Sequence, residues 1–316
     1  NQIDDDKLPA AEYLSVVDDY PQALNQLADH LARQLPPDSG ELVWLFDQSQ
    51  NMIDDRGIIS QNLQEMYLQY SLRMKYYFDL ESDVPPPLTT IISFGQNLSL
   101  HTQKSTSDLG AIRKSIDQIP VDESGQENMC GALATTLKLL APAASRSKRK
   151  LAIILVTDES GDDGDSVEDV VNLAKKFETP IFILGRETNF GSPFSQLRWF
   201  DGKSKLTHWL RINRGPETAG LECLQWNGFH SRRDVFGSGL GPFEQVRIAK
   251  ESGGIFFMLP GEEENILAVG VGNRRRSNLI PMSEYLPDLR SRKEYEQARQ
   301  QSPFRRQIWN IIQTLN

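Results

Sequence analysis

The sequence is poor in cysteine and histidine, and this scarcity excludes several classes of protein. Its 316 residues include two cysteines and four histidines. Cys130 and Cys223 are too few for a disulfide-rich scaffold or a cysteine-based zinc site. The histidines are scattered along the chain and form no H-E-x-x-H pair, the spacing typical of zinc-dependent proteases.

The chain also lacks a long hydrophobic run and an excess of basic residues. No apolar stretch approaches the roughly 18 residues that a membrane-spanning helix needs, so we predict no transmembrane segment. The chain has 34 lysines and arginines against 43 aspartates and glutamates, which gives a formal net charge of −9. Because nucleic acid is itself strongly anionic, this balance disfavours nucleic-acid binding.

Acidic and basic residues are concentrated in different parts of the chain. The first twenty residues carry six acids and one lysine, whereas residues 272–306 carry nine basic residues and four acids. This polarity favours self-association, or a contact between the basic tail and an acidic region of the protein.

Short apolar runs that alternate with helical patterns predict an α/β fold. Strands are predicted at residues 42–46, 89–94, 98–101, 151–157, 180–184 and 255–259. Helices are predicted at residues 58–78, 107–119, 130–140, 166–177 and 243–251. Uninterrupted apolar strands are typical of a sheet that is covered on both faces. The order of the elements therefore predicts a doubly wound, Rossmann-like fold with a mostly parallel six-stranded sheet.

The predicted main domain spans residues 41–260 and is flanked by helical segments. Residues 1–40 are predicted to form a helical lead-in, and residues 261–316 a helical C-terminal extension that is truncated at residue 316. One apolar face of this extension is formed by Phe304, Ile308, Ile311, Ile312 and Leu315.

Within the main domain, the segment of residues 186–242 is longer than an ordinary loop between two secondary-structure elements. They predict an inserted β-rich subdomain, with strands at residues 207–212 and 221–226.

Two acidic motifs follow predicted strands at the edge of the sheet where α/β proteins bind ligands. The first strand ends in Asp47-Gln48-Ser49-Gln50-Asn51, and the fourth ends in Thr157-Asp158-Glu159. A third loop places Glu127 just before a predicted helix. Because parallel strands end at the same edge, we expect these three loops to lie close together.

The order and spacing of these motifs resemble the von Willebrand factor type A domain, over about residues 40–185 and again over 243–259. In that family, a D-x-S-x-S loop, a threonine before a helix and an aspartate after strand four form a metal-ion-dependent adhesion site. Asp47, Ser49 and Asp158 match this pattern, whereas Asn51 replaces the second serine and Glu127 stands at the threonine position. The subtype resembles bacterial, extracytoplasmic proteins, which implies a secreted or periplasmic location.

The two departures from the family pattern change the chemistry of the site. A hard divalent cation such as Mg²⁺, Ca²⁺ or Mn²⁺ takes oxygen ligands. Glu127 would add a third carboxylate at the position where an acidic side chain of a partner otherwise binds, so we predict a metal site that is satisfied by its own chain. In the alternative, no metal binds and Asn51 donates its amide to the carboxylates. Asp47 or Asp158 could instead cap the following helix.

Further charged residues are candidate neighbours of this site. Asp162 and Asp163 lie in the same loop as Asp158. An EF-hand interpretation of residues 158–169 is disfavoured, because its sixth and twelfth positions hold aspartates instead of glycine and glutamate. The insertion leaves from the strand beside the one that ends at Asp158. We therefore predict that at least one of its arginines pairs with the excess carboxylates. These arginines are Arg211, Arg214, Arg232 and Arg233.

The resemblance implies a non-catalytic adhesion or protein-binding module, whose protein partner the sequence does not identify. The alternative is a structural or assembly protein with a vestigial, metal-free site, in which the insertion and the basic tail make the contacts. A remote alternative is a metal-dependent hydrolase. The sequence offers little for catalysis, because it contains no G-x-S-x-G motif, no Walker lysine loop and no G-x-G-x-x-G after the first strand.

Overall fold

A computed structural model describes residues 13–82, 84–189, 192–201, 204–220, 237–261 and 287–315. These residues form two compact units, each of which is described by itself. The main unit contains the described residues up to 185 together with 248–259, and the second unit contains the described residues of 186–247 and 260–315. No helix in the described part of the chain is long and apolar enough to cross a membrane.

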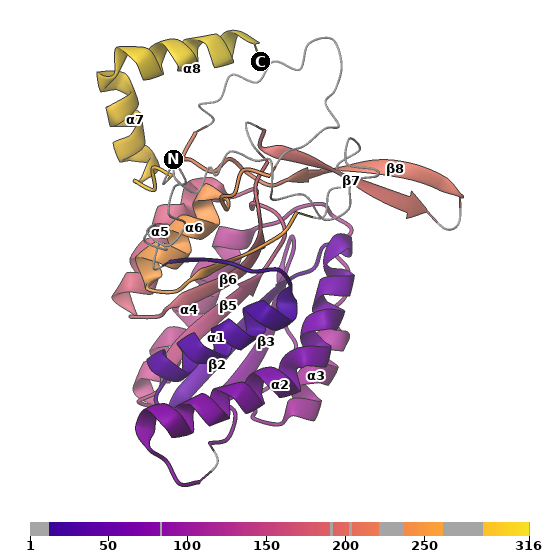
Figure 1. Cartoon of the computed structure of the whole chain (residues 1–316), viewed down its shortest axis with the longest axis vertical. Helices are drawn as coiled ribbons and strands as arrows, with labels where there is room; N and C mark the ends of the chain where they lie inside the picture. Colours follow the sequence, from indigo (N-terminus) through magenta and orange to yellow (C-terminus); the bar gives the residue numbers. More distant parts are fainter. Residues whose placement is uncertain are drawn as a thin grey trace, which may run out of the picture. The chain divides into compact units, whose positions relative to one another are not determined.

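The main unit is built on a seven-stranded sheet with the order β1-β9-β6-β5-β2-β3-β4 (Figure 1). Its strands are β1 (Leu14–Val16), β2 (Gly40–Asp47), β3 (Leu88–Phe94), β4 (Leu98–Leu100), β5 (Lys150–Val156), β6 (Ile181–Arg186) and β9 (Phe256–Leu259). Strand β2 pairs in parallel with β3 and β5, β5 with β6, and β1 with β9. Strand β4 alone of these runs antiparallel, beside β3. The prediction of a mostly parallel α/β sheet is therefore confirmed.

The predicted count of six strands is wrong, because β1 adds a seventh at the edge of the sheet. Residues 14–16 fall in the lead-in that was expected to be helical. Three residues are too few to show a periodic pattern, and this strand is defined by its pairing with β9. Helix α1 (Tyr20–Gln34) follows as expected, and the side chain of Asp19 accepts the Gln22 N–H at its N-terminus.

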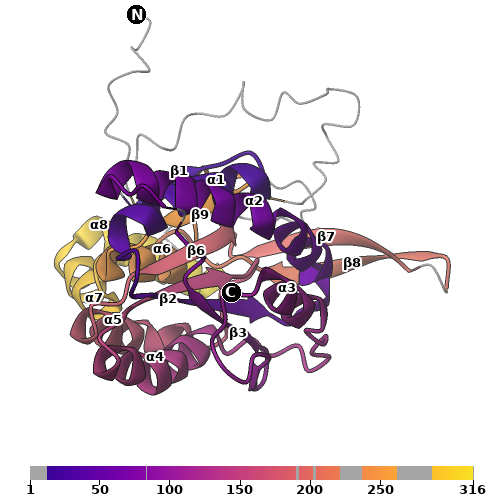
Figure 2. The ribbon, with the colours of Figure 1, turned by 90° about the horizontal axis from the view of Figure 1, so that it is seen from below.

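Helices cover both faces of the sheet. They are α2 (Ile53–Phe78), α3 (Leu109–Asp117), α4 (Met129–Arg146) and α5 (Val167–Lys176), while α6 (Phe243–Ser252) precedes β9. Helices α1 and α2 lie on one face, and α4 and α5 lie on the other (Figure 2).

The sequence of β2 shows why this strand is buried on both faces. Leu42, Trp44 and Phe46 pack in the core beneath α1 and α2. Val43 and Leu45 point to the opposite face, because side chains alternate along a strand. All five are completely buried. This arrangement holds the C-terminal end of β2, and the acidic loop after it, in a fixed place.

The second unit contains a two-stranded antiparallel sheet of β7 (Phe194–Asp201) and β8 (Leu206–Asn213). Strand β8 confirms the strand predicted at 207–212, whereas β7 was not predicted and residues 221–226 lie outside the described residues. In the predicted tail, the described residues form α7 (Arg292–Gln301) and α8 (Pro303–Leu315). A capping box between Ser291 and Glu294 starts α7.

Candidate metal-binding site

The acidic loops after β2 and β5 lie side by side at one edge of the sheet. The two strands are parallel neighbours, with Phe46 opposite Val156. Asp47 directly follows Phe46, and Asp158 comes two residues after Val156, so both acids lie where the two strands end, and both are buried. This placement agrees with the expectation from the strand order. Neither aspartate is the N-cap of the helix that follows, because the residues at those positions are Met52 and Ser166.

The carboxylate of Asp47 is held by groups of both loops. Its Oδ1 accepts the backbone N–H of Ser49 at 2.7 Å, and its Oδ2 accepts the hydroxyl of Thr157 at 2.8 Å. The buried guanidinium of Arg56 donates to the backbone carbonyl of Asp47 at 2.6 Å. This hydrogen bond stabilises the loop that follows β2. Because both oxygens are engaged, the orientation of this carboxylate is set by the fold.

Asn51 and Ser49 present different groups to the site. The amide nitrogen of Asn51 donates to Oδ2 of Asp158 at 2.5 Å. Asn51 therefore faces Asp158 as a donor, as the metal-free alternative expected. The hydroxyl oxygen of Ser49 is buried and makes no hydrogen bond of normal geometry among the described residues, although it lies close enough to Asp47 to lower the pKa of that carboxyl. A buried polar atom without a partner is costly, and such atoms often mark the place of a missing ligand.

Glu127 belongs to the same group of carboxylates. Burial, together with the negative charges of Asp47, Glu159 and Asp158, raises the pKa of Glu127 to about 11. Burial also raises the pKa of Asp47 to about 7, helped by the charge of Asp158 and opposed by the hydrogen bonds from Ser49 and Thr157. We call Asp47, Glu127 and Asp158 the buried acidic cluster, in which Asp47 and Asp158 are buried and Glu127 is half-buried. Its members repel one another when they are ionised, so the cluster favours either protons or a cation.

Asp162 and Asp163 hold the loops together. Asp162 accepts the backbone N–H of Glu127 at 3.0 Å. Asp163 accepts the backbone N–H groups of Cys130 at 2.9 Å and Gly131 at 2.6 Å, so it caps the N-terminus of α4 from another loop. Their carboxylates therefore fix the loop that carries Glu127, a role that residue type alone could not reveal.

Gly161 allows this close approach of the two loops. A Cβ atom at this position would lie 2.7 Å from Cβ of Met129 and 3.0 Å from the carbonyl oxygen of Glu127. Any side chain larger than hydrogen would push the acidic loop away from α4.

Asp122 braces a further loop at the same edge. It accepts the backbone N–H groups of Gln96 at 2.6 Å and Ser124 at 2.8 Å, and these hydrogen bonds lower its pKa. Its own N–H donates to the carbonyl oxygen of Gln48, next to Asp47. We call Asp122, Asp162 and Asp163 the bracing carboxylates.

The donor set of the buried acidic cluster fits a divalent cation in part. Asp47, Ser49, Asp158 and Glu127 offer oxygen atoms only, which suits Mg²⁺, Ca²⁺ or Mn²⁺. In the described residues, however, no three His, Cys, Asp or Glu side chains converge tightly enough to form a ready-made metal site. In this orientation, the amide nitrogen of Asn51 faces Asp158. The side chain can ligate a cation only after its amide group rotates and its oxygen faces the site instead.

Three residues that contact the loops of the site were not identified from the sequence. Thr157 was assigned to the strand, and Arg56 and Asp122 gave no signal, because their roles depend on loops that meet only in the folded chain.

Among the predicted arginines, Arg211 stacks over the ring of Phe194, with 3.5 Å between guanidinium and ring centre, and Arg214 is fully buried. Arg232 and Arg233 lie outside the described residues. The pairing of an arginine with the carboxylates stays a prediction.

Residues 41–197 match the family model of the von Willebrand factor type A domain. BatB, a conserved hypothetical protein from Bacteroides thetaiotaomicron, is a similar solved structure with 16% identity and a TM-score of 0.41, over 70% of this chain and 91% of that chain.

Two further solved structures show similarly low identity. An aerotolerance-related membrane protein from Bacteroides fragilis, with multiple mutations to serines, is 17% identical with a TM-score of 0.38, over 69% of this chain and 90% of that chain. Proximal thread matrix protein 1 from the mussel byssus, with a zinc-occupied MIDAS motif, is 16% identical with a TM-score of 0.38, over 48% of this chain and 37% of that chain. Curated protein sequences give no significant match.

Proposed function

We propose that this chain, which contains a von Willebrand factor type A domain over residues 41–197, is a non-catalytic protein-binding module with a variant divalent-cation site. Domains of this family typically mediate protein interactions.

The observation that carries the proposal is the buried acidic cluster together with the buried hydroxyl of Ser49. Acidic side chains whose charges raise the pKa of a neighbour are stabilised by a cation, because the cation offsets their repulsion. Asp47, Ser49 and Asp158 would hold the ion. When bound, such an ion supplies positive charge that attracts acidic groups.

Glu127 distinguishes this site from one that is open to a partner. Its carboxyl lies within the electrostatic influence of Asp47 and Asp158, so it is placed to serve as a ligand from the same chain. We infer that Glu127 takes the position of a partner's acidic side chain. The protein partner would then bind the surface around the site without ligating the metal directly.

A second candidate function is a structural or assembly role with a metal-free site. The hydrogen bond from Asn51 to Asp158 favours it, because this contact neutralises part of the cluster without an ion. In that case the insertion and the basic tail would make the contacts with other proteins. A secreted or periplasmic location suits either role and is part of the proposal.

Calorimetric titration with Mg²⁺, Ca²⁺ and Mn²⁺ tests the proposal. We expect the wild-type protein to bind at least one of these ions, and Asp47→Ala to weaken binding about tenfold or more, because a charged first ligand is lost. Asp169→Asn is the matched control, since it removes an exposed carboxylate from the same acidic stretch. If the wild-type protein binds none of the three ions, the metal-free alternative replaces the proposal.

The substitution Glu127→Thr tests the role of Glu127 itself. It restores the hydroxyl that the family pattern has at this position, so it should open the ion to acidic ligands from outside. We expect the metal-loaded variant to bind acetate or an acidic peptide that the wild-type protein does not bind, measured by calorimetry. Equal affinities of the two proteins would show that Glu127 does not block the site.

A further inference from the structure

A series of hydrogen bonds runs from the edge of the sheet to the loop after β2. It begins at His101, which directly follows the edge strand β4. The Nε2 atom of His101 lies 2.6 Å from the hydroxyl oxygen of Ser93 on β3, and the side-chain amide of Gln48 donates to the same oxygen at 2.7 Å. Gln48 stands between Asp47 and Ser49, so the series ends inside the loop that carries two residues of the site. We call His101, Ser93 and Gln48 the hydrogen-bond relay.

The backbone of Gln48 joins the strands to the loops of the site. Its N–H donates to the carbonyl oxygen of Phe94 at 2.8 Å, and its carbonyl oxygen accepts the N–H of Asp122 at 3.0 Å. The side chain of Gln48 is buried. A rearrangement of this residue therefore acts on the loop of Asp47 and on the loop of Asp122 together.

The serine and the histidine of the relay do not form a catalytic pair. A nucleophilic serine must reach its substrate, whereas Ser93 is completely buried in the sheet. His101 is half-buried, so water reaches the relay at its histidine end. The relay is therefore suited to transmit the protonation state of His101 inward.

The hydrogen bonds define the direction of the relay and the protonation state of its histidine. The hydroxyl oxygen of Ser93 accepts the amide of Gln48, and His101 is its other partner among the described residues. A buried hydroxyl without an acceptor is costly, so the hydrogen of Ser93 points to His101. The Nε2 atom must then offer a lone pair, which makes the ring neutral with its proton on Nδ1.

The surroundings of His101 favour this neutral ring. Burial, together with the positive charge of Arg56 on α2, lowers the pKa of His101 below its ordinary value. The neighbouring β3 and α3 contribute uncharged groups, since Ser93 contacts the ring and Ser115 donates to the carbonyl oxygen of His101 at 3.5 Å. No carboxylate of the described residues contacts the ring, so its charged form has no acidic partner there.

We propose that His101 is a proton-sensitive positioning residue for the loop of Asp47 and that it acts through Ser93 and Gln48. While the ring is neutral, the relay holds Gln48 in place. When a proton from water binds to Nε2, the ring becomes a donor, and Ser93 can no longer give it a hydrogen. The hydroxyl then turns to Gln48, whose amide must present its oxygen instead of its nitrogen. This reversal loosens the loop as the pH falls.

An NMR titration of the protein in chelator tests the relay without any ion. We expect the ring of His101 to titrate below pH 6.5, its ordinary value, and the side-chain amide of Gln48 to shift with the same midpoint. Asp47 titrates at about pH 7, so its midpoint is different. In Ser93→Ala, the ring should titrate closer to pH 6.5 and the amide should no longer follow it, because the link is lost. A wild-type amide that does not follow the ring overturns the proposal, as does an amide that still follows it in Ser93→Ala.

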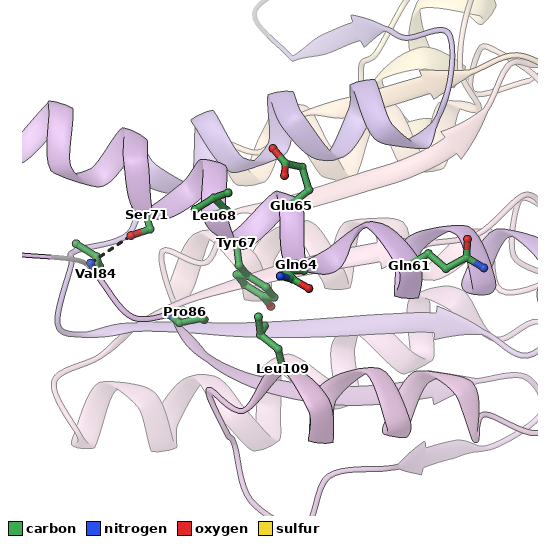
Figure 3. Close-up of a pocket in the computed structure, with 9 residues that line it drawn as sticks. All are labelled: Gln61, Gln64, Glu65, Tyr67, Leu68, Ser71, Val84, Pro86 and Leu109. Carbon is green, nitrogen blue, oxygen red and sulfur yellow. Dashed lines mark hydrogen bonds between the residues drawn. The ribbon is translucent and has the colours of Figure 1, made fainter.

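Tyr67→Phe is the matched control, because it removes a buried hydroxyl that bonds to the same strand. The ring of Tyr67 lines a groove with Pro86 and Leu109 beside it (Figure 3). Its hydroxyl lies 2.9 Å from that of Thr89 on β3, four residues before Ser93. Tyr67→Phe should leave the titrations of the relay as in the wild-type protein. A control that changes them as Ser93→Ala does would show a general loosening of the sheet and would contradict the relay.

The effect of the relay on an ion rests on the proposed function and is measured separately, by calorimetry with Ca²⁺ above about pH 7. We expect His101→Phe to raise the dissociation constant about tenfold, because groups behind the ligands control metal affinity. His101→Gln should restore most of the affinity, since its side-chain oxygen can accept from Ser93. Equal affinities of His101→Phe and wild type overturn the positioning role. A wild-type protein that binds no ion contradicts the proposed function instead, and the titration in chelator still decides on the relay.

Discussion

Two carboxylates at the same edge of the sheet, Asp47 and Asp122, have pKa values that are shifted in opposite directions. In the buried acidic cluster, burial and neighbouring negative charge raise the pKa of Asp47 to about 7. Among the bracing carboxylates, backbone N–H groups lower the pKa of Asp122. Each of these two carboxylates accepts two hydrogen bonds, so the difference lies in how far water is excluded and in the negative charge of Asp158 beside Asp47. Carboxylates of the first kind are suited to bind a cation, whereas those of the second kind stabilise the loops.

The largest expected effect is on stability, from Asp163→Ala. This substitution removes the acceptor for two backbone N–H groups at the N-terminus of α4, so the free energy of unfolding should fall by about 2 kcal/mol. Chemical denaturation measures the change. The exposed Asp169→Asn serves as the control and should stay within about 0.5 kcal/mol of wild type. An unchanged stability of Asp163→Ala would show that the capping contact is dispensable.

A smaller effect is expected from pH on the cation-free protein. The folded pKa values of Asp47 and Glu127 lie above their unfolded values, so their stabilising contribution is complete below about pH 4 and is lost as the pH rises through the folded values. The free energy of unfolding in chelator should therefore fall by about 1 kcal/mol or more between about pH 5 and about pH 9.

The double variant Asp47→Asn/Glu127→Gln isolates the cluster from other titrating groups. Its denaturation curves should depend less on pH over the same range. If variant and wild type show the same pH dependence, the raised pKa values do not originate in the cluster.

The smallest effect is expected from Asp122→Ala. This residue also accepts two backbone N–H groups, but they belong to loops and not to the end of a helix, so its loss should cost about 0.5–1 kcal/mol. Hydrogen exchange should increase at Gln96 and Ser124, whose N–H groups it accepts, and stay unchanged on α5. A loss as large as that of Asp163→Ala would remove the distinction between a carboxylate that caps a helix and one that joins loops.

The sequence predicted most of the sheet because its central strands are long apolar runs. Strand β5 reads as such a run and was found at residues 150–156. Strand β1 was missed because three residues carry no periodic signal and depend on their pairing with β9. Strand β7 was missed inside a segment whose irregular composition gave no alternation. Long-range pairing defines both of these strands.

The position of the site was predictable because both acidic loops directly follow apolar strands that lie in parallel. The contacts inside the site were less predictable. The same loop contains Asp158, which faces Asn51, and Asp163, which caps a distant helix. No local pattern separates these roles, because each depends on a loop that is remote in the sequence. Asn51 was nevertheless foreseen as a donor to the carboxylates in the metal-free alternative.

Calorimetry of Ca²⁺ binding in two buffers of different ionisation enthalpy tests the central claim most directly. Glu127 is protonated near neutral pH and must lose its proton to ligate an ion, because metal ligands bind in their deprotonated form. Asp47, with a pKa of about 7, is about half protonated there as well, so the account predicts that the wild-type protein binds Ca²⁺ and releases between one and two protons for each ion bound. Absence of binding heat in both buffers, or binding without proton release, would contradict it.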